Sequence, residues 1–292
     1  MVFKKELYPW FLLFILSLIW GSSPILIKKA LVSLSPYEIG SLRLTFAAVV
    51  LIPFLGKNFK EIKKKDYLIL FISGIVGNVI PYFLYPIAQT NIDSATSGVL
   101  TSLTPFFALL IGVIFYKQNA TKNNIIGLIT GFIGTTILII FSSKVGVIGN
   151  NVFGLFVVLA TLLYGINLNL IKYHLNHLKP VTITSFSIVS ILPVTFYILL
   201  SETPFIDHMN NYESYKLEFF YVFVLGFLST SVATLIFYNL IKIKDTVFAS
   251  MVTYLMPIVA IFIGIADGEI INIIQVGGMI LILTGVFVNS KD

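Results

Sequence analysis

The stretch LIWGSSPILIKKALVSLSPYEIGSLR at residues 18–43 decides the fold, because it recurs as LLYGINLNLIKYHLNHLKPVTITSFS at residues 162–187. The two segments align without gaps, and ten of their 26 positions are identical, including Gly21 with Gly165. Self-similarity over this length indicates that the chain contains an internal repeat.

A second match extends the repeat toward the C-terminus. Residues 74–112 align with residues 226–264, now offset by 152 positions instead of 144. The eight extra residues fall in the polar stretch Ser201–Lys216. A repeat unit with five membrane spans starts its second copy on the opposite side of the membrane, which predicts an inverted-topology repeat, an architecture typical of secondary transporters. We assign residues 1–146 to the first five-helix repeat and residues 147–292 to the second.

The composition indicates a polytopic membrane protein. The chain is 57% hydrophobic and 11% charged, with a mean hydropathy of +0.97. Soluble domains carry about a quarter charged residues. The chain has no cysteine, and its three histidines lie in apparent loops. It shows no phosphate-binding glycine loop, zinc motif or nucleophile elbow, so we expect no cofactor, no metal, no nucleic-acid partner and no enzymatic activity.

Hydropathy predicts an all-α protein with ten transmembrane helices, since about 20 apolar residues cross the hydrocarbon core of a bilayer. The apolar run near the N-terminus lacks the cleavage site of a signal peptide, and we expect it to be retained as the first span. The ten predicted spans are Trp10–Ile27, Tyr37–Leu55, Tyr67–Ile87, Ser94–Tyr116, Ile125–Phe141, Phe153–Lys172, Val181–Leu200, Phe219–Leu240, Thr246–Ala266 and Ile273–Val288.

The lysines predict the orientation of these spans, because short cytoplasmic loops are enriched in Lys and Arg. With the N-terminus in the cytoplasm, fourteen lysines fall on the cytoplasmic side and four on the other side. Ten spans then place both termini in the cytoplasm. The richness in Lys, Ile and Phe is typical of low-GC bacteria. We therefore expect a multi-pass protein of a bacterial inner membrane, present as a monomer or a homodimer.

Prolines and glycines are expected to shape the spans. Pro105 and Pro257 occupy equivalent places in the two repeats, where each would fix a kink or form a hinge for gating. Small residues let membrane helices approach closely. Spans five and ten share one glycine spacing, which predicts a packing or dimer face made of Gly127, Gly134, Gly278 and Gly285.

The third span carries a polar face. Four polar residues recur there at spacings of four, three and four, namely Asn78, Tyr82, Tyr85 and Gln89. Such a face must meet protein or water. A bond to a neighbouring helix would explain one of the four, whereas four in register favour a cavity wall. The fourth span repeats the spacing, and its residues suit a bond to the backbone and a site equally well: Ser97, Thr101 and Thr104.

Spans one and six carry comparable residues at equivalent positions. Trp20 aligns with Tyr164, and Ser23 aligns with Asn167. A tryptophan in the middle of a span is unusual, because Trp prefers the membrane interfaces. The pairing favours two facing walls of one cavity. Spans eight and nine add further candidates: Thr230, Thr234, Tyr238, Asn239, Thr253 and Tyr254.

Arg43 is the only arginine, and it lies well inside a predicted span. An ionisable residue within the membrane is a functional hypothesis by default. The structural alternative, which we favour, is a bond from Arg43 to Glu38 or to a carbonyl that fixes span two. The functional alternatives are binding of a substrate carboxylate and closure of an outer gate. Asp93 precedes the fourth span, where its carboxylate would cap free N–H groups.

Several short motifs together resemble the drug/metabolite transporter superfamily. They are Trp-Gly-Ser-Ser at residues 20–23, Asp-Ser-Ala at residues 93–95 and Gln-Val-Gly-Gly at residues 275–278. Within that superfamily the chain resembles the EamA family, whose members carry two copies of one five-helix unit. The resemblance covers essentially the whole chain. In the second copy, Tyr164 stands at the position of Trp20, and Ser187 stands at the position of Arg43.

The resemblance implies a helical-bundle carrier that exports small metabolites, often amino acids. It also implies a central cavity lined mainly by spans one, three, four, six, eight and nine, with span two at the periphery.

The predicted function is a secondary transporter that moves amino acids or related amphipathic solutes across the inner membrane by alternating access. A membrane channel and an integral-membrane transferase are the alternatives. A channel would need a selectivity filter, and a transferase would need converging acids, histidines or metal ligands. The residues expected to line the substrate cavity are Trp20, Ser23, Asn78, Tyr82, Tyr85, Gln89, Thr101, Tyr164, Asn167, Thr234, Tyr238, Asn239 and Tyr254.

Overall fold

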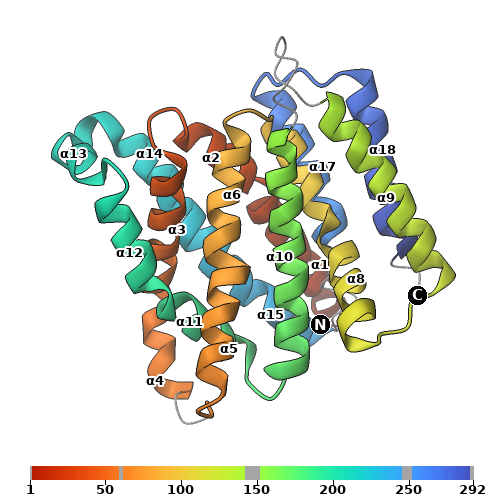
Figure 1. Cartoon of the computed structure of the whole chain (residues 1–292), viewed down its shortest axis with the longest axis horizontal. Coiled ribbons are helices and arrows are strands. Elements are labelled where there is room, and N and C mark those ends of the chain that lie inside the picture. Colours follow the sequence, from red (N-terminus) through yellow and green to blue (C-terminus); the bar gives the residue numbers. More distant parts are fainter. Residues whose placement is uncertain (1, 59–61, 142–151, 245–251, 290–292) are drawn as a thin grey trace.

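The computed structural model describes residues 2–58, 62–141, 152–244 and 252–289. Within these ranges the chain is helical apart from short connections, and the helices form one bundle (Figure 1). The first half of the chain forms α1 (Val2–Gly21), α2 (Ser23–Ala30), α3 (Pro36–Leu51), η1 (Ile52–Phe54), α4 (Leu55–Asn58), α5 (Asp66–Gly74), η3 (Ile75–Val79), α6 (Ile80–Gln89), α7 (Ser94–Leu100), η4 (Thr101–Leu103), α8 (Thr104–Tyr116) and α9 (Lys122–Phe141). The second half forms α10 (Phe153–His174), α11 (Pro180–Ser190), α12 (Leu192–Ser201), α13 (Phe205–Asn210), α14 (Tyr212–Val224), η6 (Leu225–Val232), α15 (Ala233–Ile243), α17 (Val252–Ala266) and α18 (Ile273–Asn289).

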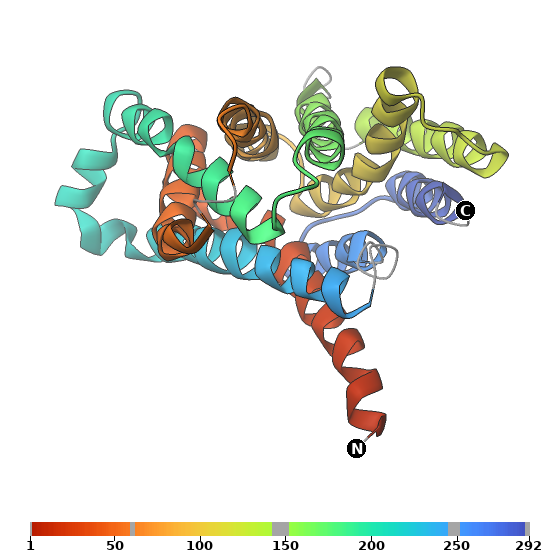
Figure 2. The ribbon, with the colours of Figure 1, turned by 90° about the horizontal axis from the view of Figure 1, so that it is seen from below.

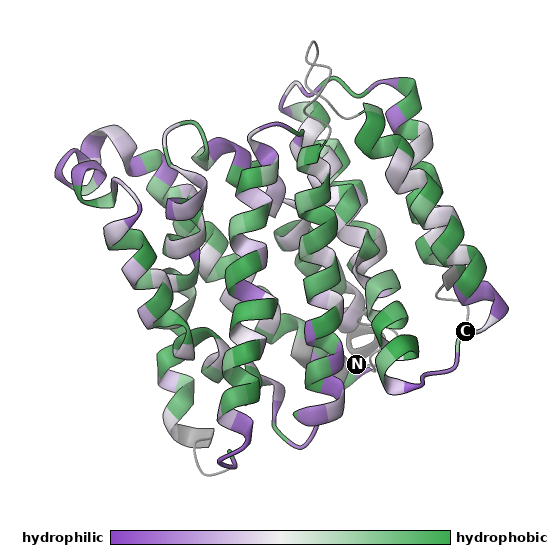
Figure 3. Ribbon diagram, in the orientation of Figure 1, coloured by the Kyte–Doolittle hydropathy of each residue, from purple (hydrophilic) through white to green (hydrophobic). Residues whose placement is uncertain are grey.

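The helices have the length and surface of a membrane bundle. Eight stretches in the described part of the chain are long and apolar enough to cross a membrane, and α17 and α18 contain two shorter apolar helices. Phe115, Phe132 and Phe262 are each 70% exposed on outward faces, which suits lipid rather than water as the surrounding medium. Hydrophilic residues gather at the two ends of the bundle, and hydrophobic residues cover the length between them (Figure 3).

Several of the prolines divide one span into two helices. Pro24, Pro81 and Pro105 each lie in the first turn of a helix, where a missing N–H breaks no intrahelical bond. The two prolines predicted to be equivalent differ in their surroundings. Pro105 follows the 3-10 turn η4, so the fourth span is interrupted there, whereas Pro257 lies inside the continuous helix α17.

The spans pack in pairs that join the two halves of the chain. Helix α1 packs against α15 and α17, whereas α10 packs against α6 and α8. Helix α3 packs against α12 and η6, and α9 packs along α18. The view from below shows α9 and α18 side by side at one edge of the bundle (Figure 2). The polar stretch at residues 201–216 contains the short helix α13, which lies at the opposite edge (Figure 2).

The glycines of spans five and ten form a contact within one chain. A Cβ atom on Gly285 would lie 2.6 Å from the carbonyl oxygen of Gly127 and 2.7 Å from the nitrogen of Gly131. A Cβ atom on Gly134 would lie 2.7 Å from the carbonyl oxygen of Gly278. The predicted packing or dimer face therefore packs α9 against α18.

The two ends of the bundle can be named after lysines on the helices that finish there. Helix α2 finishes at the upper end in Figure 1, which we call the Lys28 end. Helix α10 finishes at the lower end, which we call the Lys172 end.

Candidate functional site

A cavity of about 600 Å³ lies in the middle of the bundle. Small-molecule sites commonly have volumes of about 300–1,000 Å³. The walls come from predicted spans one, three, four, six, eight and nine, joined by Arg43 of span two and by the segment after α8. The polar and aromatic side chains of the lining are Trp20, Ser23, Arg43, Tyr82, Tyr85, Thr101, Ser102, Thr104, Gln118, Tyr164, Asn167, Asn169, Lys172, Ser229, Thr234, Phe237 and Thr253.

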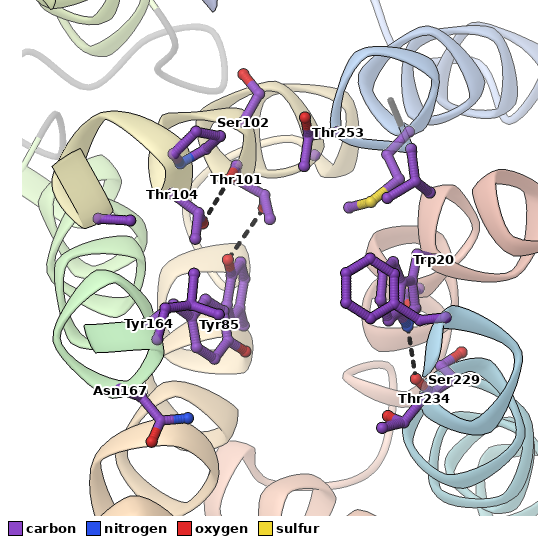
Figure 4. Close-up of a pocket in the computed structure, with 18 of the residues that line it drawn as sticks. Trp20, Tyr85, Thr101, Ser102, Thr104, Tyr164, Asn167, Ser229, Thr234 and Thr253 are labelled. Atoms are coloured by element: carbon purple, nitrogen blue, oxygen red, sulfur yellow. Dashed lines mark hydrogen bonds between the residues drawn. The ribbon is translucent and has the colours of Figure 1, made fainter. Parts of the chain in front are cut away.

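One wall is built around two tyrosines from different halves of the chain. The rings of Tyr85 and Tyr164 stack with their centroids 6.1 Å apart. The Tyr85 hydroxyl donates to Thr101 Oγ1 at 3.1 Å, and that hydroxyl donates to the carbonyl oxygen of Ser97 at 2.8 Å. Figure 4 shows this wall, with Tyr85 directed toward Thr101. The chain of bonds fixes Tyr85 against the interrupted fourth span.

The facing wall is built around Trp20. Its Nε1 donates to the carbonyl oxygen of Ser229 at 2.8 Å, and its ring lies 5.5 Å from that of Phe237. Ser229 belongs to η6, a π-helical stretch, and such stretches are frequent at functional sites. Trp20 and Ser229 lie across the cavity from Tyr85 and Tyr164 in Figure 4. The predicted pairing of Trp20 with Tyr164 thus corresponds to two opposite walls of one space.

Asn167 lines the cavity beside the π-helical stretch η3. Its Oδ1 accepts a hydrogen bond of 2.6 Å from the hydroxyl of Ser73. Gly77 lies directly against this amide, because a Cβ atom on Gly77 would overlap Asn167 Nδ2. A glycine is therefore required for Asn167 to hold this position.

Of the thirteen side chains predicted to bind the substrate, eight line the central cavity: Trp20, Ser23, Tyr82, Tyr85, Thr101, Tyr164, Asn167 and Thr234. Asn78, Gln89 and Asn239 do not line it. Gln89 is buried against span four, where its Nε2 donates to Ser97 Oγ at 3.1 Å, and Asn239 is exposed on α15. The side chains of Tyr238 and Tyr254 lie outside the described part of the structure.

The polar face of the third span meets different neighbours along its length. Helical spacing places Asn78, Tyr82, Tyr85 and Gln89 on one face, but it does not say which neighbour that face meets at each level. The structure directs the middle of the face toward the cavity and the Gln89 level toward span four. Asn78 and Gln89, at the two ends of this face, therefore do not line the cavity.

The two prolines predicted as gating or structural residues also differ at the cavity. Pro105 lines it next to the interruption in span four. Pro257 is buried inside α17 and does not line it.

Arg43 and Glu38 do not form the bond that the sequence favours. Arg43 Nε donates to Thr230 Oγ1 at 3.0 Å, and the guanidinium carbon lies 3.9 Å from the centre of the Tyr82 ring. Glu38 is fully buried, and its two carboxylate oxygens lie 3.0 and 3.1 Å from His208 Nδ1. The expected pairing of Arg43 with Glu38 was wrong because α13 brings His208 onto Glu38. The expectation that span two is peripheral fails at Arg43, which lines the cavity.

A network of charges joins the helices at the Lys28 end. Glu269 Oε1 accepts from the Ser94 nitrogen at 3.0 Å and from the Ser94 hydroxyl at 2.6 Å, and Oε2 accepts from the Ala95 nitrogen at 3.0 Å. Lys28 Nζ lies 2.9 Å from Glu269 and 2.7 Å from Asp267. Lys29 also pairs with Asp267. Glu269 therefore holds α7 and α2 to the segment between α17 and α18.

Glu269 takes the capping role predicted for Asp93. Asp93 is the N-cap residue of α7, but its side chain makes no capping hydrogen bond. The carboxylate that accepts from the first N–H groups of α7 comes instead from Glu269, 175 positions from Ser94 along the chain. An anionic group at this position is favourable because the free N–H groups carry a partial positive charge.

The pH dependence of stability should report on this network. Hydrogen bonds from Lys28 and Lys29 lower the pKa of Asp267 below its usual 3.8. Burial alone would raise the pKa of Glu269, but the bonds from Ser94, Lys28 and Ala95 outweigh burial and lower it below 4.5. A carboxylate with a lower pKa in the folded protein stabilises the fold at neutral pH, and its contribution is lost as the pH falls through the folded-state pKa.

We therefore expect the Asp267→Asn variant to melt at a lower temperature than the natural protein by a constant amount between about pH 5 and pH 8. The difference should shrink below about pH 4, because both proteins then lack the charge. Melting in detergent over this pH range measures it. Glu213→Gln is the matched control, since the Lys216–Glu213 pair is exposed and such pairs contribute little. A difference that stayed constant to about pH 2 would contradict the assignment.

The cavity includes several residues that the sequence does not single out. Gln118 follows α8, and Lys172 lies near the end of α10, so both extend the lining to the Lys172 end. From the sequence, Lys172 is only a topology signal. At the opposite end the lining stops at Ile27 and Gly98, which are buried. The cavity therefore runs from the middle of the bundle toward the Lys172 end.

Comparisons with known proteins agree with this architecture. The profile of the EamA-like transporter family matches residues 8–140 and 153–291. An uncharacterized transporter of Archaeoglobus fulgidus is 27% identical over 286 residues, which cover 96% of this chain and 97% of that protein. The uncharacterized transporter YoaV of Bacillus subtilis is 25% identical over 288 residues and 94% of each chain. A solved crystal structure has a TM-score of 0.64 at 15% identity, over 95% of this chain and 94% of that chain, and shares the fold.

Proposed function

The chain belongs to the EamA-like transporter family, and from this membership and the central cavity we propose that it moves amino acids or related amphipathic metabolites across the membrane by alternating access. The cavity is the observation that carries the proposal. Its facing walls present aromatic rings with polar tips, which suit a solute that is partly apolar. The protein would lie in the lipid bilayer and transport a small molecule.

The packing of the helices supports two repeats of five spans, residues 1–146 and 147–292. If span n of the first half corresponds to span n + 5 of the second half, then each contact between halves should have a counterpart. The contact of α1 with α17 corresponds to that of α10 with α8, and the contact of α1 with α15 corresponds to that of α10 with α6. The contact of α9 with α18 is its own counterpart. An inverted repeat would produce this pattern.

The two ends of the cavity support alternating access. The Glu269 network ties α2 and α7 together at the Lys28 end, where the lining stops. The lining continues to Gln118 and Lys172 at the other end. In an alternating-access cycle this arrangement corresponds to the state that is open at the Lys172 end. The return state would require the Glu269 network to separate.

The lysine distribution supports an orientation for this cycle. The Lys172 end carries most of the lysines and would face the cytoplasm, with both termini on that side. The cavity would then load from the cytoplasm of a bacterial inner membrane, and net flux would be export. The described residues of one chain enclose the cavity, so the cycle could run in a monomer or in each copy of a homodimer.

Counterflow in proteoliposomes tests the proposal. Purified protein is reconstituted, the vesicles are loaded with one unlabelled amino acid, and uptake of its labelled form is followed across a panel of amino acids and amines. We expect uptake of one class, and a loss of about tenfold or more in Tyr82→Ala and Asn167→Ala, because each removes a side chain that lines the cavity.

Asn239→Ala is the matched control for Asn167→Ala, since it removes an exposed amide outside the cavity. Its uptake should equal that of the natural protein. If folded Asn167→Ala and Tyr82→Ala each took up as much substrate as the natural protein, the cavity would not be the substrate site. Uptake that did not depend on a loaded counter-substrate and did not saturate would favour a channel.

A further inference from the structure

Arg43 is the most unusual charge in the described membrane region. It lies seven positions after Pro36 in a span that runs from Pro36 to Phe54, so it is near the middle of that span. Its side chain lines the cavity, although the residue is only 7% exposed. A guanidinium remains charged at any physiological pH. A full positive charge is therefore held inside the bundle, beside the space that would hold the substrate.

The contacts of Arg43 leave part of its guanidinium unused. Nε donates to Thr230 Oγ1 at 3.0 Å, and the plane lies over Tyr82 with the guanidinium carbon 3.9 Å from the ring centre. The two terminal nitrogens make no hydrogen bond with any described residue. Thr230 and Tyr82 thus hold the side chain in place while its forked end stays available.

The charge of Arg43 is also without a counter-ion in the described part of the chain. The ion pairs found there involve Glu38, Asp66, Glu213, Asp267 and Glu269, and none of them includes Arg43. The carboxylate nearest in sequence, Glu38, is engaged with His208. A buried cation with no counter-ion is unfavourable, unless something else in the site supplies a negative charge.

The lining around Arg43 points to an anion as the missing partner. Lys172 is the other charged residue among the lining residues, and no Asp or Glu is present among them. The cavity therefore combines a net positive charge with aromatic walls. A planar fork with free N–H donors matches a carboxylate, which can accept two parallel hydrogen bonds.

We propose that Arg43 binds the carboxylate of the substrate, so that the cargo is an amphipathic carboxylate whose apolar part lies between the walls of Trp20 and Tyr164. The inference rests on the proposed transport function and names its substrate class. An amino acid fits, because its carboxylate meets Arg43. The amide of the same amino acid lacks the negative charge that Arg43 would recognise. The amine formed by its decarboxylation carries only a positive charge. Lys172, at the mouth of the cavity, would attract the same anionic group.

The test compares three compounds that share one side chain. Each apolar amino acid, for example leucine or phenylalanine, is assayed by counterflow together with its amide and its decarboxylated amine. We expect the natural protein to take up the acid at least about tenfold better than the other two. In Arg43→Gln, uptake of the acid should fall at least about tenfold, while uptake of the amide changes little, so that the preference disappears.

Two further variants separate binding from a structural role. Thr230→Val removes the acceptor of the Nε bond but keeps the charge, and it should keep the preference for the acid. Arg43→Lys keeps the charge without the fork, and it should keep part of the preference. A purely structural Arg43 would lower uptake of all three compounds equally in Arg43→Gln. If Arg43→Gln does not fold, the preference of the natural protein and of Arg43→Lys decides the question.

The possible failures are distinguishable. Uptake of amides or amines equal to that of acids in the natural protein would overturn the role of Arg43 and leave the transport function standing. A preference for the acid that survives in folded Arg43→Gln would do the same. No counterflow of any compound by folded protein would overturn both proposals.

Discussion

Glu269→Gln is expected to open the cavity at the Lys28 end. A cysteine placed in the cavity should then react from that end about tenfold faster than in the natural background. The chain contains no cysteine, so a single Ser23→Cys substitution supplies the only thiol. Ser23 lines the cavity, and serine and cysteine are similar in size. Right-side-out membrane vesicles and a membrane-impermeant thiol reagent give the measurement.

The size of the effect follows from the bonds that Glu269 makes. Its carboxylate accepts three hydrogen bonds from Ser94 and Ala95 and pairs with Lys28. Hydrogen bonds to charged groups contribute about 1.5–3 kcal/mol each. A change of about 1.4 kcal/mol in the balance between two states shifts their ratio tenfold. In the proposed cycle, loss of the charge weakens several bonds that hold the Lys28 end closed, so we expect a shift of about tenfold or more.

Controls isolate the network from general damage. Glu213→Gln removes the charge of an exposed pair on α14 and should leave the reactivity of the Ser23→Cys thiol unchanged. Glu213→Cys, in a chain with natural Ser23, reports that the reagent reaches this face of the vesicles. The Ser23→Cys thiol is compared in two backgrounds, one with natural Glu269 and one with Glu269→Gln. Equal rates of reaction in the two would show that the network does not keep the cavity closed.

The sequence predicted the broad fold because that fold depends on local patterns. Long apolar runs define the spans, and the gapless match of residues 18–43 with residues 162–187 indicates a repeat before any contact is known. The interruptions within spans were only partly predictable. Pro105 interrupts its span as expected, yet the equivalent Pro257 does not. The π-helical stretches η3 and η6 carry no sequence signal that we could recognise.

The candidate site was predictable where two independent signals agreed. Trp20, Tyr164 and Asn167 stood out because polar or aromatic residues recur at equivalent mid-span positions, and all three line the cavity. A single signal, helical spacing, was correct for Tyr82 and Tyr85 but not for Gln89. Helical spacing places Gln89 on the same face as Tyr82 and Tyr85. However, this face meets the cavity at the tyrosines and span four at Gln89. The bonds of Glu269 to Ser94 and of Arg43 to Thr230 join residues far apart in the chain, and only the tertiary structure reveals them.

Gly285→Leu is expected to destabilise the protein, whereas Gly277→Leu in the same helix is not. A Cβ atom on Gly285 would lie 2.6 Å from the carbonyl oxygen of Gly127, so α18 would have to move away from α9. A Cβ atom on Gly277 would have no neighbour within 4 Å. Overpacking costs about 1–3 kcal/mol in a well-packed interior, and rigid backbone leaves little room for relaxation here.

The paired glycines make the test specific for contact rather than for composition. Both substitutions add the same side chain to α18, and both replace a residue of low helix propensity. Gly285→Leu should lower the melting temperature in detergent by roughly 5 °C or more, since 1 kcal/mol corresponds to about 2–4 °C in proteins of 150–250 residues. Gly277→Leu should melt at or above the natural temperature, because its side chain faces the lipid or detergent. Equal melting of the two variants would mean that α9 and α18 do not meet at Gly127 and Gly285.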